Sequence, residues 1–382
     1  MYNSESIVYF DNNATTKVDS RVLAAMIPFL AEEYANPHSA HYFGNEINKA
    51  IEKARAQVAS IIGAYREEIT FTSGSTEAIN IAIKGISDLY GHKSKHIITV
   101  ATEHHAVLDT CKFLEGKGFE ITYLGVNDSG LIDLDELKAS LRSDTILVCL
   151  MFANNETGII QPIKEVASIV KKTGALFFTD ATQAIGKIDI NVYDFGIDIL
   201  CLSGHKIYGP KGVGALYIKN GINLPTYTHG GGQEKGLRSG TLNVPGIVAL
   251  GVACEICNNE MHDDAHRIGQ LRDKLEGGLL RIPETYVNGD RGHRVYNVTN
   301  MCFKGIDASV LIGRLRDIAV SNGSACTSAV EEPSHVLIAM GLSEGDANAS
   351  IRFSLGRFNT ESEVDIAIKR FSEIMLTKLR YA

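Results

Sequence analysis

Residues 201–218 read CLSGHKIYGPKGVGALYI. An apolar run, 197–202, ends there in the turn SGHK, and a second apolar run, 213–218, follows the glycines. Short apolar runs bounded by turn residues are typical of buried strands. The pattern therefore places Lys206 where a buried strand opens into a glycine-rich turn. A solvated surface lysine is the ordinary interpretation, whereas a desolvated lysine in a cleft serves as an amine nucleophile.

The composition is that of an ordinary globular protein. The chain has 382 residues, of which 45% are hydrophobic and 21% charged, and its net charge is −8. This length suggests one large domain with a smaller one. The acidity does not favour direct nucleic-acid binding, and the longest apolar run, 146–153, is too short to span a membrane.

Strand-like and helix-like patterns alternate through the first two thirds of the chain. The predicted strands are 95–99, 120–124, 146–152, 175–179, 197–202 and 213–218, and the predicted helices are 20–34, 45–62, 77–89, 105–117, 133–141 and 163–172. Continuous apolar strands separated by amphipathic helices predict an α/β fold with a mostly parallel sheet covered on both faces. Ligands of such sheets bind beyond the carboxyl ends of the strands.

The pattern changes after about residue 244. It predicts a long helix, 244–280, then strands at 297–303 and 351–355 and helices at 308–317 and 361–380. We expect a smaller α+β domain here, joined by the N-terminal segment. The predicted boundaries are 16–258 for the large domain, with 1–15 and 259–382 in the small one.

Three signals follow one another at predicted strand ends. The small-residue turn TSGSTE, 72–77, precedes a helix and suits a phosphate, although ordinary helix capping also explains it. Asp180 closes an apolar strand, where it either caps a helix or meets a cation such as a protonated pyridine nitrogen. Lys206 ends the next strand. A phosphate cradle, an acid and a Schiff-base lysine are what a pyridoxal phosphate site needs, and nucleotide motifs are missing from the sequence.

Five further residues are candidates for the same site. His104 or His105 could stack on a flat ring or carry a proton. Asn155 and Gln183 could hydrogen-bond a phenolic oxygen or a substrate. Arg352 could clamp a substrate α-carboxylate. Solvated, capping or structural ion-pair roles are the alternatives for each of them.

Seven cysteines without a tight framework indicate a reducing compartment, and MYNSESIVYFDNN shows no secretory signal, so we expect a cytoplasmic protein. Cys326 lies in a stretch of small polar residues, SNGSACTS, that is typical of a loop and leaves a thiol accessible, whether reactive or inert. A possible zinc group lies within the predicted long helix, so its side chains should not converge on one ion. It consists of Cys254, Cys257, His262 and His266.

Together these motifs resemble those of the cysteine desulfurases of the NifS/IscS type, within the fold-type I pyridoxal phosphate enzymes. The resemblance covers essentially the whole chain. It rests on YFDNNATT, Asn36-Pro37 with His41, TSGSTEAIN, EHHAVLD, NNETG, TDATQAIGK, SGHKIYGPKG, RSGTLNVP, GSACTS followed by EPS, and SIRFSLGRF. The cysteine loop is similar to that of the group I subfamily, not the group that includes selenocysteine lyase. Asn322, where many relatives carry serine, is a departure that we expect to change the loop more than the chemistry.

The resemblance implies a large domain with a mostly parallel seven-stranded sheet and a small domain that carries the cysteine loop, at about residues 321–334. It implies that Lys206 holds the cofactor as a Schiff base and that Asp180 pairs with the pyridinium nitrogen. The other implied contacts are His104 on the ring, Gln183 on the phenolic oxygen, Ser75, Thr76, Ser203 and His205 on the phosphate, Thr241 on the phosphate of the other subunit, Asn155 on cofactor and substrate, and Arg352 on the substrate. Cys326 is the implied sulfur acceptor, and the only metal contact implied is a transient iron–sulfur cluster on that residue.

The implied reaction takes sulfur from L-cysteine, leaves L-alanine and forms a persulfide on Cys326. A homodimer would then pass the sulfur to a scaffold or other acceptor protein for iron–sulfur cluster assembly, without contacting nucleic acid or a membrane. Similar enzymes supply tRNA thiolation and DNA phosphorothioation. An aminotransferase would keep Lys206, Asp180 and Arg352 but would not need Cys326, and a non-catalytic scaffold would lack the bound cofactor.

Overall fold

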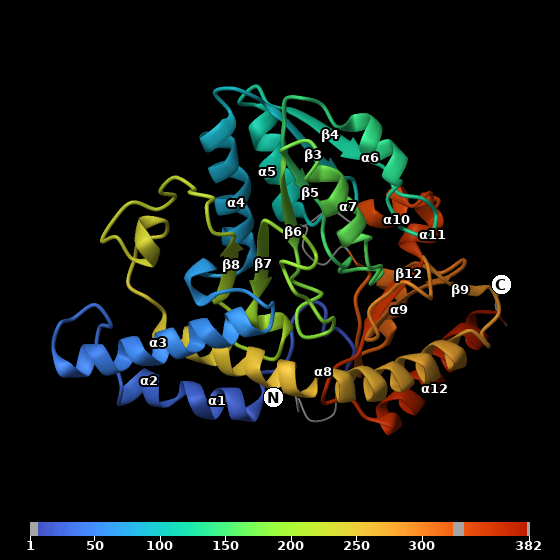
Figure 1. Cartoon of the computed structure of the whole chain (residues 1–382). Helices are drawn as coiled ribbons and strands as arrows, with labels where there is room; N and C mark the ends of the chain where they lie inside the picture. Colours follow the sequence, from blue (N-terminus) through green and yellow to red (C-terminus); the bar gives the residue numbers. More distant parts are fainter. Residues whose placement is uncertain (1–6, 324–331, 380–382) are drawn as a thin grey trace.

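The computed structural model describes residues 7–323 and 332–379, with side chains as far as residue 375. A seven-stranded sheet forms the centre of the molecule (Figure 1). Its order is β2 (Ile69–Thr72), β8 (Gly214–Ile218), β7 (Ile199–Ser203), β6 (Leu176–Asp180), β5 (Thr145–Cys149), β3 (His96–Val100) and β4 (Glu120–Leu124). In this sheet β8 runs antiparallel to both of its neighbours, β2 and β7, and all the other pairs are parallel. The predicted mostly parallel sheet is therefore confirmed.

Helices cover both faces of the sheet. One face packs against α4 (Ser75–Tyr90) and α5 (His105–Glu115), and the other packs against α3 (Tyr42–Ser60), α6 (Leu134–Ser140), α7 (Ile163–Val170) and the first half of α8 (Val244–Leu279). Successive strand side chains point to opposite faces. Thus Leu147 and Cys149 lie in the core under α4, while Val148 lies in the other core. Burial on both faces explains why these strands read as continuous apolar runs.

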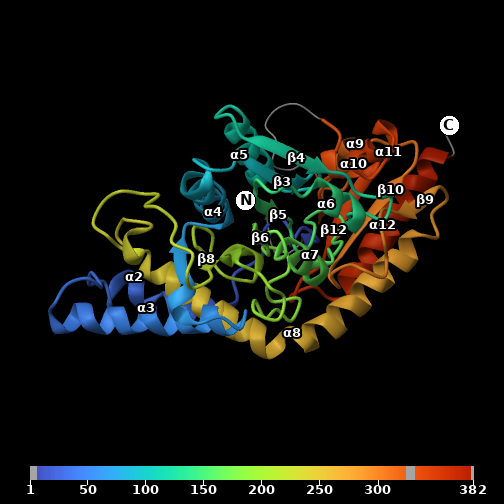
Figure 2. The same ribbon diagram turned by 45° about the horizontal axis from the view of Figure 1, so that its top comes forward.

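A second core lies in the smaller part of the molecule, drawn in orange and red in Figures 1 and 2. Its antiparallel sheet has the order β12 (Ser350–Ser354), β10 (Val298–Phe303), β9 (Thr285–Val287). A separate parallel pair joins β1 (Val8–Tyr9) to β11 (Ile318–Ala319). The surrounding helices are α9 (Ala308–Arg314), α10 (His335–Ala339), α11 (Glu344–Asn348) and α12 (Glu361–Leu379).

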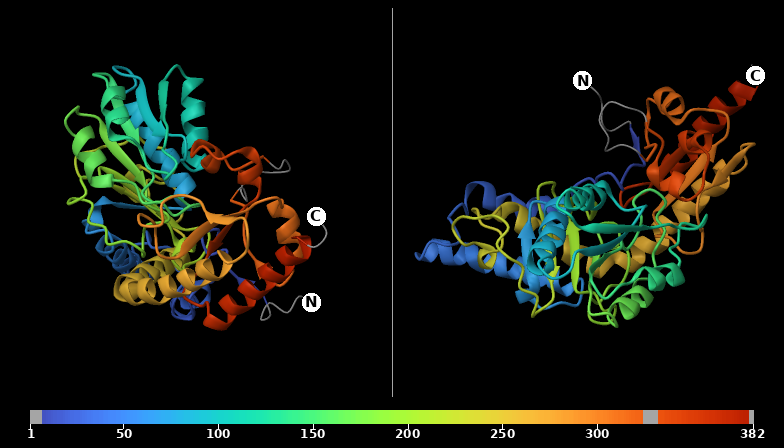
Figure 3. Two further views of the ribbon diagram at one scale, coloured as in Figure 1. Left: turned by 90° about the vertical axis from the view of Figure 1, so that its right-hand side faces the viewer. Right: turned by 90° about the horizontal axis from the view of Figure 1, so that it is seen from above.

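The long helix α8 runs along the base of both parts (Figures 1 and 3). It contributes side chains as far as Cys257 to the first core and from Ile268 onward to the second. The predicted boundary at residue 258 falls between these two positions; as a division into domains it stays a prediction. None of the described helices is long and apolar enough to cross a membrane.

Two predicted elements need correction. The predicted helix 20–34 is two shorter helices, α1 (Ser20–Met26) and α2 (Pro28–Ala31), because Pro28 lacks the N–H that would continue the first one. The regular strand within the predicted 146–152 ends at Cys149: the N–H groups of Leu150 and Phe152 still donate to the carbonyls of Phe178 and Asp180, but the N–H of Met151 donates to the Glu103 carboxylate. Asn155 therefore lies in a turn beyond the strand and does not close it.

Candidate active site

A cavity of 420 Å³ lies at the carboxyl ends of the central strands. The structure brings nine of the predicted site residues to its wall: Ser75, Thr76, His104, Asn155, Asp180, Gln183, His205, Lys206 and Arg352. Ser203 and Thr241 do not line it. Cys326 lies outside the described residues, although Gly323, shortly before it, is part of the wall.

The N-terminus of α4 forms one end of the cavity. Gly74 precedes the helix with φ 152° and ψ 179°, a conformation that is essentially restricted to glycine. As the N-cap, Gly74 offers no side chain to the helix, so the first-turn N–H groups are not capped from within. Ser75 and Thr76 follow at once and line the cavity. An uncapped helix N-terminus that faces a cavity fits a phosphate group.

Two further residues predicted to bind the phosphate, His205 and Ser203, lie near this turn, but only His205 lines the cavity. His205 lines the cavity, and burial, with the nearby charges of Lys206 and Lys211, lowers its pKa to about 4, so its ring is neutral at pH 7. Ser203, the last residue of β7, has its Oγ 3.6 Å from where a Cβ on Gly74 would stand. It therefore lies next to the turn but is not part of the cavity wall.

Asp180 ends β6 and is only 5% exposed. One carboxylate oxygen accepts hydrogen bonds from the backbone N–H of Thr182 at 2.9 Å and from the thiol of Cys201 at 3.3 Å. Among the described residues, no basic side chain forms an ion pair with it. A buried carboxylate without a cation is costly. The position therefore fits a protonated ring nitrogen as the missing partner.

Lys206 lies in the single 3₁₀ turn Gly204–Lys206 that follows β7. Its Nζ donates to the backbone carbonyls of Asn13, at 2.6 Å, and Ala14, at 2.7 Å. The carbonyl of Asn13 also accepts from Nε2 of Gln183, and its side chain donates to the carbonyl of Asn155. Asn13 thus joins three predicted site residues, although the sequence analysis gave it no role.

Arg352 forms the structural ion pair that was one of its two predicted roles. Its Nη2 forms an ion pair with Asp11 at 2.7 Å, and its Nη1 donates to the carbonyl of Asn155 at 3.1 Å. Its Nε has no hydrogen-bond partner among the described residues. The guanidinium is therefore held by the protein at the cavity wall, where its contact with a substrate carboxylate stays a prediction. Asp11 is a second residue that the sequence reasoning missed.

His104 is the N-cap of α5. Its Nδ1 accepts the backbone N–H of Ala106 at 3.1 Å, so the proton of the neutral ring lies on Nε2. Burial lowers the pKa of His104. The positive charge of Lys206 lowers it further, while the negative charge of Asp180 acts in the opposite direction. A neutral ring at the cavity wall can stack on a flat cofactor and accept a proton.

The neighbouring acid Glu103 carries a prediction about stability. Burial raises its pKa from 4.5 to about 8, with the charge of Asp180 acting in the same direction and the N–H of Met151 opposing it. The folded protein thus keeps a proton that the unfolded chain has lost. This retained proton contributes fully to the stability of the folded protein below pH 4.5, and the contribution disappears as the pH rises to about 8.

Glu103→Gln should therefore remove part of the loss of stability between pH 4.5 and 8. At pH 8.5 we expect the variant to be more stable than wild type by on the order of 2 kcal/mol. Denaturant unfolding across this pH range measures the effect. The matched control is Glu115→Gln, because Glu115 is exposed on the next helix. Equal pH slopes for wild type and Glu103→Gln would contradict the buried neutral carboxyl.

The described cysteines do not offer a nucleophile. All six are buried free thiols, and burial raises the pKa of each: Cys111, Cys149, Cys201, Cys254, Cys257 and Cys302. A buried thiol with a raised pKa is inert. A sulfur-accepting thiol therefore has to be sought outside this set.

The possible zinc group lies, as predicted, along one continuous helix, α8. Cys254 and Cys257 are buried, while His262 is exposed and lies 3.6 Å from Asp189. His266 contacts Gln270 on the same helix. These side chains do not converge, and no cluster of three or more such ligands occurs among the described residues.

Comparison with known proteins identifies the family. The model of the class-V aminotransferases matches residues 8–366. The cysteine desulfurase IscS of Rickettsia typhi is 48% identical over 365 residues, which cover 94% of this chain and 89% of the relative. A human cysteine desulfurase is 49% identical over 367 residues, which cover 95% of this chain and 80% of the relative.

Comparison of the fold with solved structures indicates the same family. The solved structure of a NifS-like protein superposes with a TM-score of 0.92 at 43% identity, covering 97% of this chain and 100% of the other. Class-V aminotransferases and cysteine desulfurases use pyridoxal 5'-phosphate. The uncapped α4, the lysine turn and Asp180, which has no basic partner in the part of the chain that the structure describes, fit that group. The chain therefore belongs to the class-V aminotransferase family, and within it to the pyridoxal phosphate-dependent cysteine desulfurases.

Proposed function

We propose that this cysteine desulfurase transfers the sulfur of L-cysteine to Cys326 and from there to an acceptor protein of iron–sulfur cluster assembly. The observation that carries the proposal is the convergence, in one cavity of 420 Å³, of the α4 N-terminus, Asp180, Lys206 and Arg352. These groups match the phosphate, ring nitrogen and aldehyde of the cofactor and the carboxylate of an amino acid.

The chain's own residues would hold the cofactor and the substrate in a fixed relation. Ser75 and Thr76, with the first-turn N–H groups of α4, would bind the phosphate, and Asp180 would keep the ring nitrogen protonated. Arg352 would take the substrate α-carboxylate, and the Lys206 amine would remove the α-proton. Pyridoxal phosphate, when bound, would supply an electron sink. His104, neutral and with its proton on Nε2, would contact the ring and could exchange a proton.

The sulfur step balances without an added oxidant. The Cys326 thiolate attacks the substrate sulfur, so a sulfur–sulfur bond forms and the carbon–sulfur bond of L-cysteine breaks. The electron pair of that bond stays with the carbon skeleton, which takes up the thiol proton and leaves as L-alanine. The persulfide on Cys326 carries the sulfur at the oxidation level that an acceptor protein needs.

We further propose a cytoplasmic homodimer. Thr241 is exposed in the single chain and does not line its own cavity, which supports its predicted reach to the phosphate of a second subunit. Large exposed apolar side chains gather on α1, α2 and the start of α3, as a subunit contact requires: Leu23, Ile27, Leu30, Tyr34 and Tyr42. The free described cysteines support a reducing compartment.

Mass spectrometry after brief exposure to L-cysteine tests the proposal. We expect one added sulfur on the peptide that contains Cys326, together with L-alanine. Cys326→Ser is the matched variant and should bind the cofactor but form no adduct. Alanine without an adduct on Cys326 would contradict the assigned acceptor. A cofactor-loaded protein that forms neither product would contradict the desulfurase reaction itself.

A further inference from the structure

The backbone two residues beyond Lys206 adopts an unusual conformation. Tyr208 has φ 65°, in the left-handed region that non-glycine residues rarely adopt. Its N–H donates to Oγ1 of Thr16 at 2.8 Å, and its carbonyl accepts from the N–H of Asp19 at 3.0 Å. Thr16 also donates, from both its N–H and its Oγ1, to the carbonyl of His205. Strain of this kind persists only where surrounding contacts enforce it.

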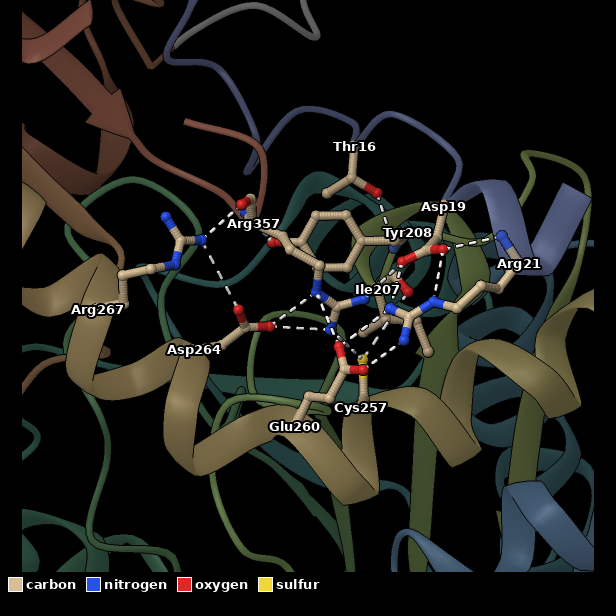
Figure 4. Close-up of polar contacts among 10 residues, drawn as sticks. All are labelled: Thr16, Asp19, Arg21, Ile207, Tyr208, Cys257, Glu260, Asp264, Arg267 and Arg357. Atoms are coloured by element: carbon tan, nitrogen blue, oxygen red, sulfur yellow. Dashed lines mark hydrogen bonds and ion pairs between the residues drawn. The ribbon is translucent and has the colours of Figure 1, made fainter. Parts of the chain in front are cut away.

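The side chain of Tyr208 is held by the smaller part of the molecule. Its Oη accepts the backbone N–H of Arg357 at 2.8 Å, and the Arg357 guanidinium lies 4.4 Å from the centre of its ring. Figure 4 shows the same guanidinium contacting Asp19 and Asp264, at 3.0 and 2.9 Å. These two acids come from α1's N-cap and from α8. Arg357 is only 10% exposed, so the contacts are well shielded from water.

Around the Tyr208–Arg357 contact, three positive side chains meet three negative ones. Arg357, Arg21 and Arg267 face Asp19, Glu260 and Asp264 (Figure 4). Of these six, only Arg357, Asp19 and Asp264 are shielded from water. Removing one member of this shielded group leaves an uncompensated charge, which is strongly unfavourable.

Arg357 lies five residues after Arg352 in the same segment. Arg352 is in β12, which ends at Ser354, and the backbone N–H of Leu355 donates to Asn297 before the chain reaches Arg357. The Tyr208–Arg357 contact thus joins the segment of the substrate-binding arginine to the turn of the reactive lysine. Ile207, next to the lysine, belongs to the first core, and Ile351 and Phe353, on either side of the arginine, belong to the second. The contact adds to the link that Asn13 and Asn155 make between Lys206 and Arg352.

We propose that Tyr208 and Arg357 are positioning residues that fix the separation of Arg352 and Lys206, and so hold the α-carbon of L-cysteine beside the lysine amine. The inference rests on the proposed roles of Arg352 and Lys206. The substrate carboxylate must reach Arg352 while the α-carbon lies beside Lys206. Loosening the Tyr208–Arg357 contact therefore weakens amino-acid binding.

The test compares three variants by KM, kcat, thermal unfolding and L-alanine binding followed by cofactor absorbance. Tyr208→Phe removes only the Oη acceptor, and we expect KM for L-cysteine to rise by about 3- to 10-fold with kcat changed less than about twofold. Arg357→Gln should have a larger effect, and Arg357→Lys, which keeps the charge, should lie between it and wild type. L-Alanine affinity should fall in parallel with the rise in KM.

Arg21→Gln is the matched control. Arg21 belongs to the same network and is half exposed, but its contacts are with Asp19 and Glu260 and not with Tyr208. We expect it to lower the unfolding temperature slightly and to leave KM unchanged. If Tyr208→Phe and Arg357→Lys alter stability but neither KM nor L-alanine binding, or if Arg21→Gln raises KM equally, the positioning role is wrong.

Arg352→Gln separates this inference from the proposed function. It should raise KM for L-cysteine by about 10²-fold, since it removes the carboxylate donor itself. If Arg352→Gln leaves KM unchanged, the proposed substrate contact fails. If it raises KM while Tyr208→Phe and both Arg357 variants leave KM unchanged, only the positioning role fails.

Discussion

Lys206→Ala is expected to lower kcat for alanine formation by at least about 10³-fold, because it removes both the amine that holds the cofactor and the base that takes the α-proton. The visible absorbance of the lysine-bound cofactor, at about 400 nm, should be lost. Steady-state kinetics and an absorbance spectrum of the same preparation measure both effects. Added methylamine should restore part of the activity, since a small amine can reach the vacated position.

The fold should survive this change. The acceptors of the Lys206 ammonium are backbone carbonyls, and that of Asn13 still receives the Gln183 amide. Lys211→Ala is the matched control, because Lys211 lies exposed in the loop that follows this turn and does not line the cavity. A Lys206→Ala protein that keeps near-wild-type turnover, or a Lys211→Ala protein that loses it, would contradict the assignment of Lys206.

The parts of the site that the sequence predicted are those fixed by local pattern. Asp180 and Lys206 each follow a buried apolar strand, and the observed strands lie within two residues of the predicted ones. Burial on both faces makes such strands apolar throughout, and turn residues mark their ends. The small-residue turn before α4 was visible for the same reason.

The parts that the sequence did not predict depend on contacts between distant segments. Asn13 lines the cavity and Asp11 pairs with Arg352 in a segment that follows β1, which is paired with β11 more than 300 residues away. The four-residue strand β2 is defined by its antiparallel pairing with β8, which no local periodicity reveals. The left-handed Tyr208 and its contact with Arg357 likewise arise only when the two cores meet. Pairing across such separations leaves no mark on the local hydrophobic pattern.

Asp180→Asn has the second-largest expected effect. The amide keeps an oxygen that can accept the N–H of Thr182, but it cannot hold a proton on the ring nitrogen. We expect kcat to fall by at least about 10²-fold at pH 8. The remaining activity should rise as the pH is lowered, because protonation of the ring then comes from solvent. A pH–rate profile of the loaded enzyme measures both.

The same substitution should not destabilise the protein without cofactor. Asp180 is buried and, among the described residues, has no basic partner, so its charge is a cost in the empty cavity that the neutral amide removes. Thermal unfolding of cofactor-free Asp180→Asn should therefore give a Tm equal to or above that of wild type. Asp198→Asn is the control, because Asp198 pairs with Lys219 before β7 and away from the cavity, so its loss should lower Tm and spare kcat. A lower Tm for Asp180→Asn, with kcat retained, would assign Asp180 a structural role and would contradict its function as the partner of the cofactor ring.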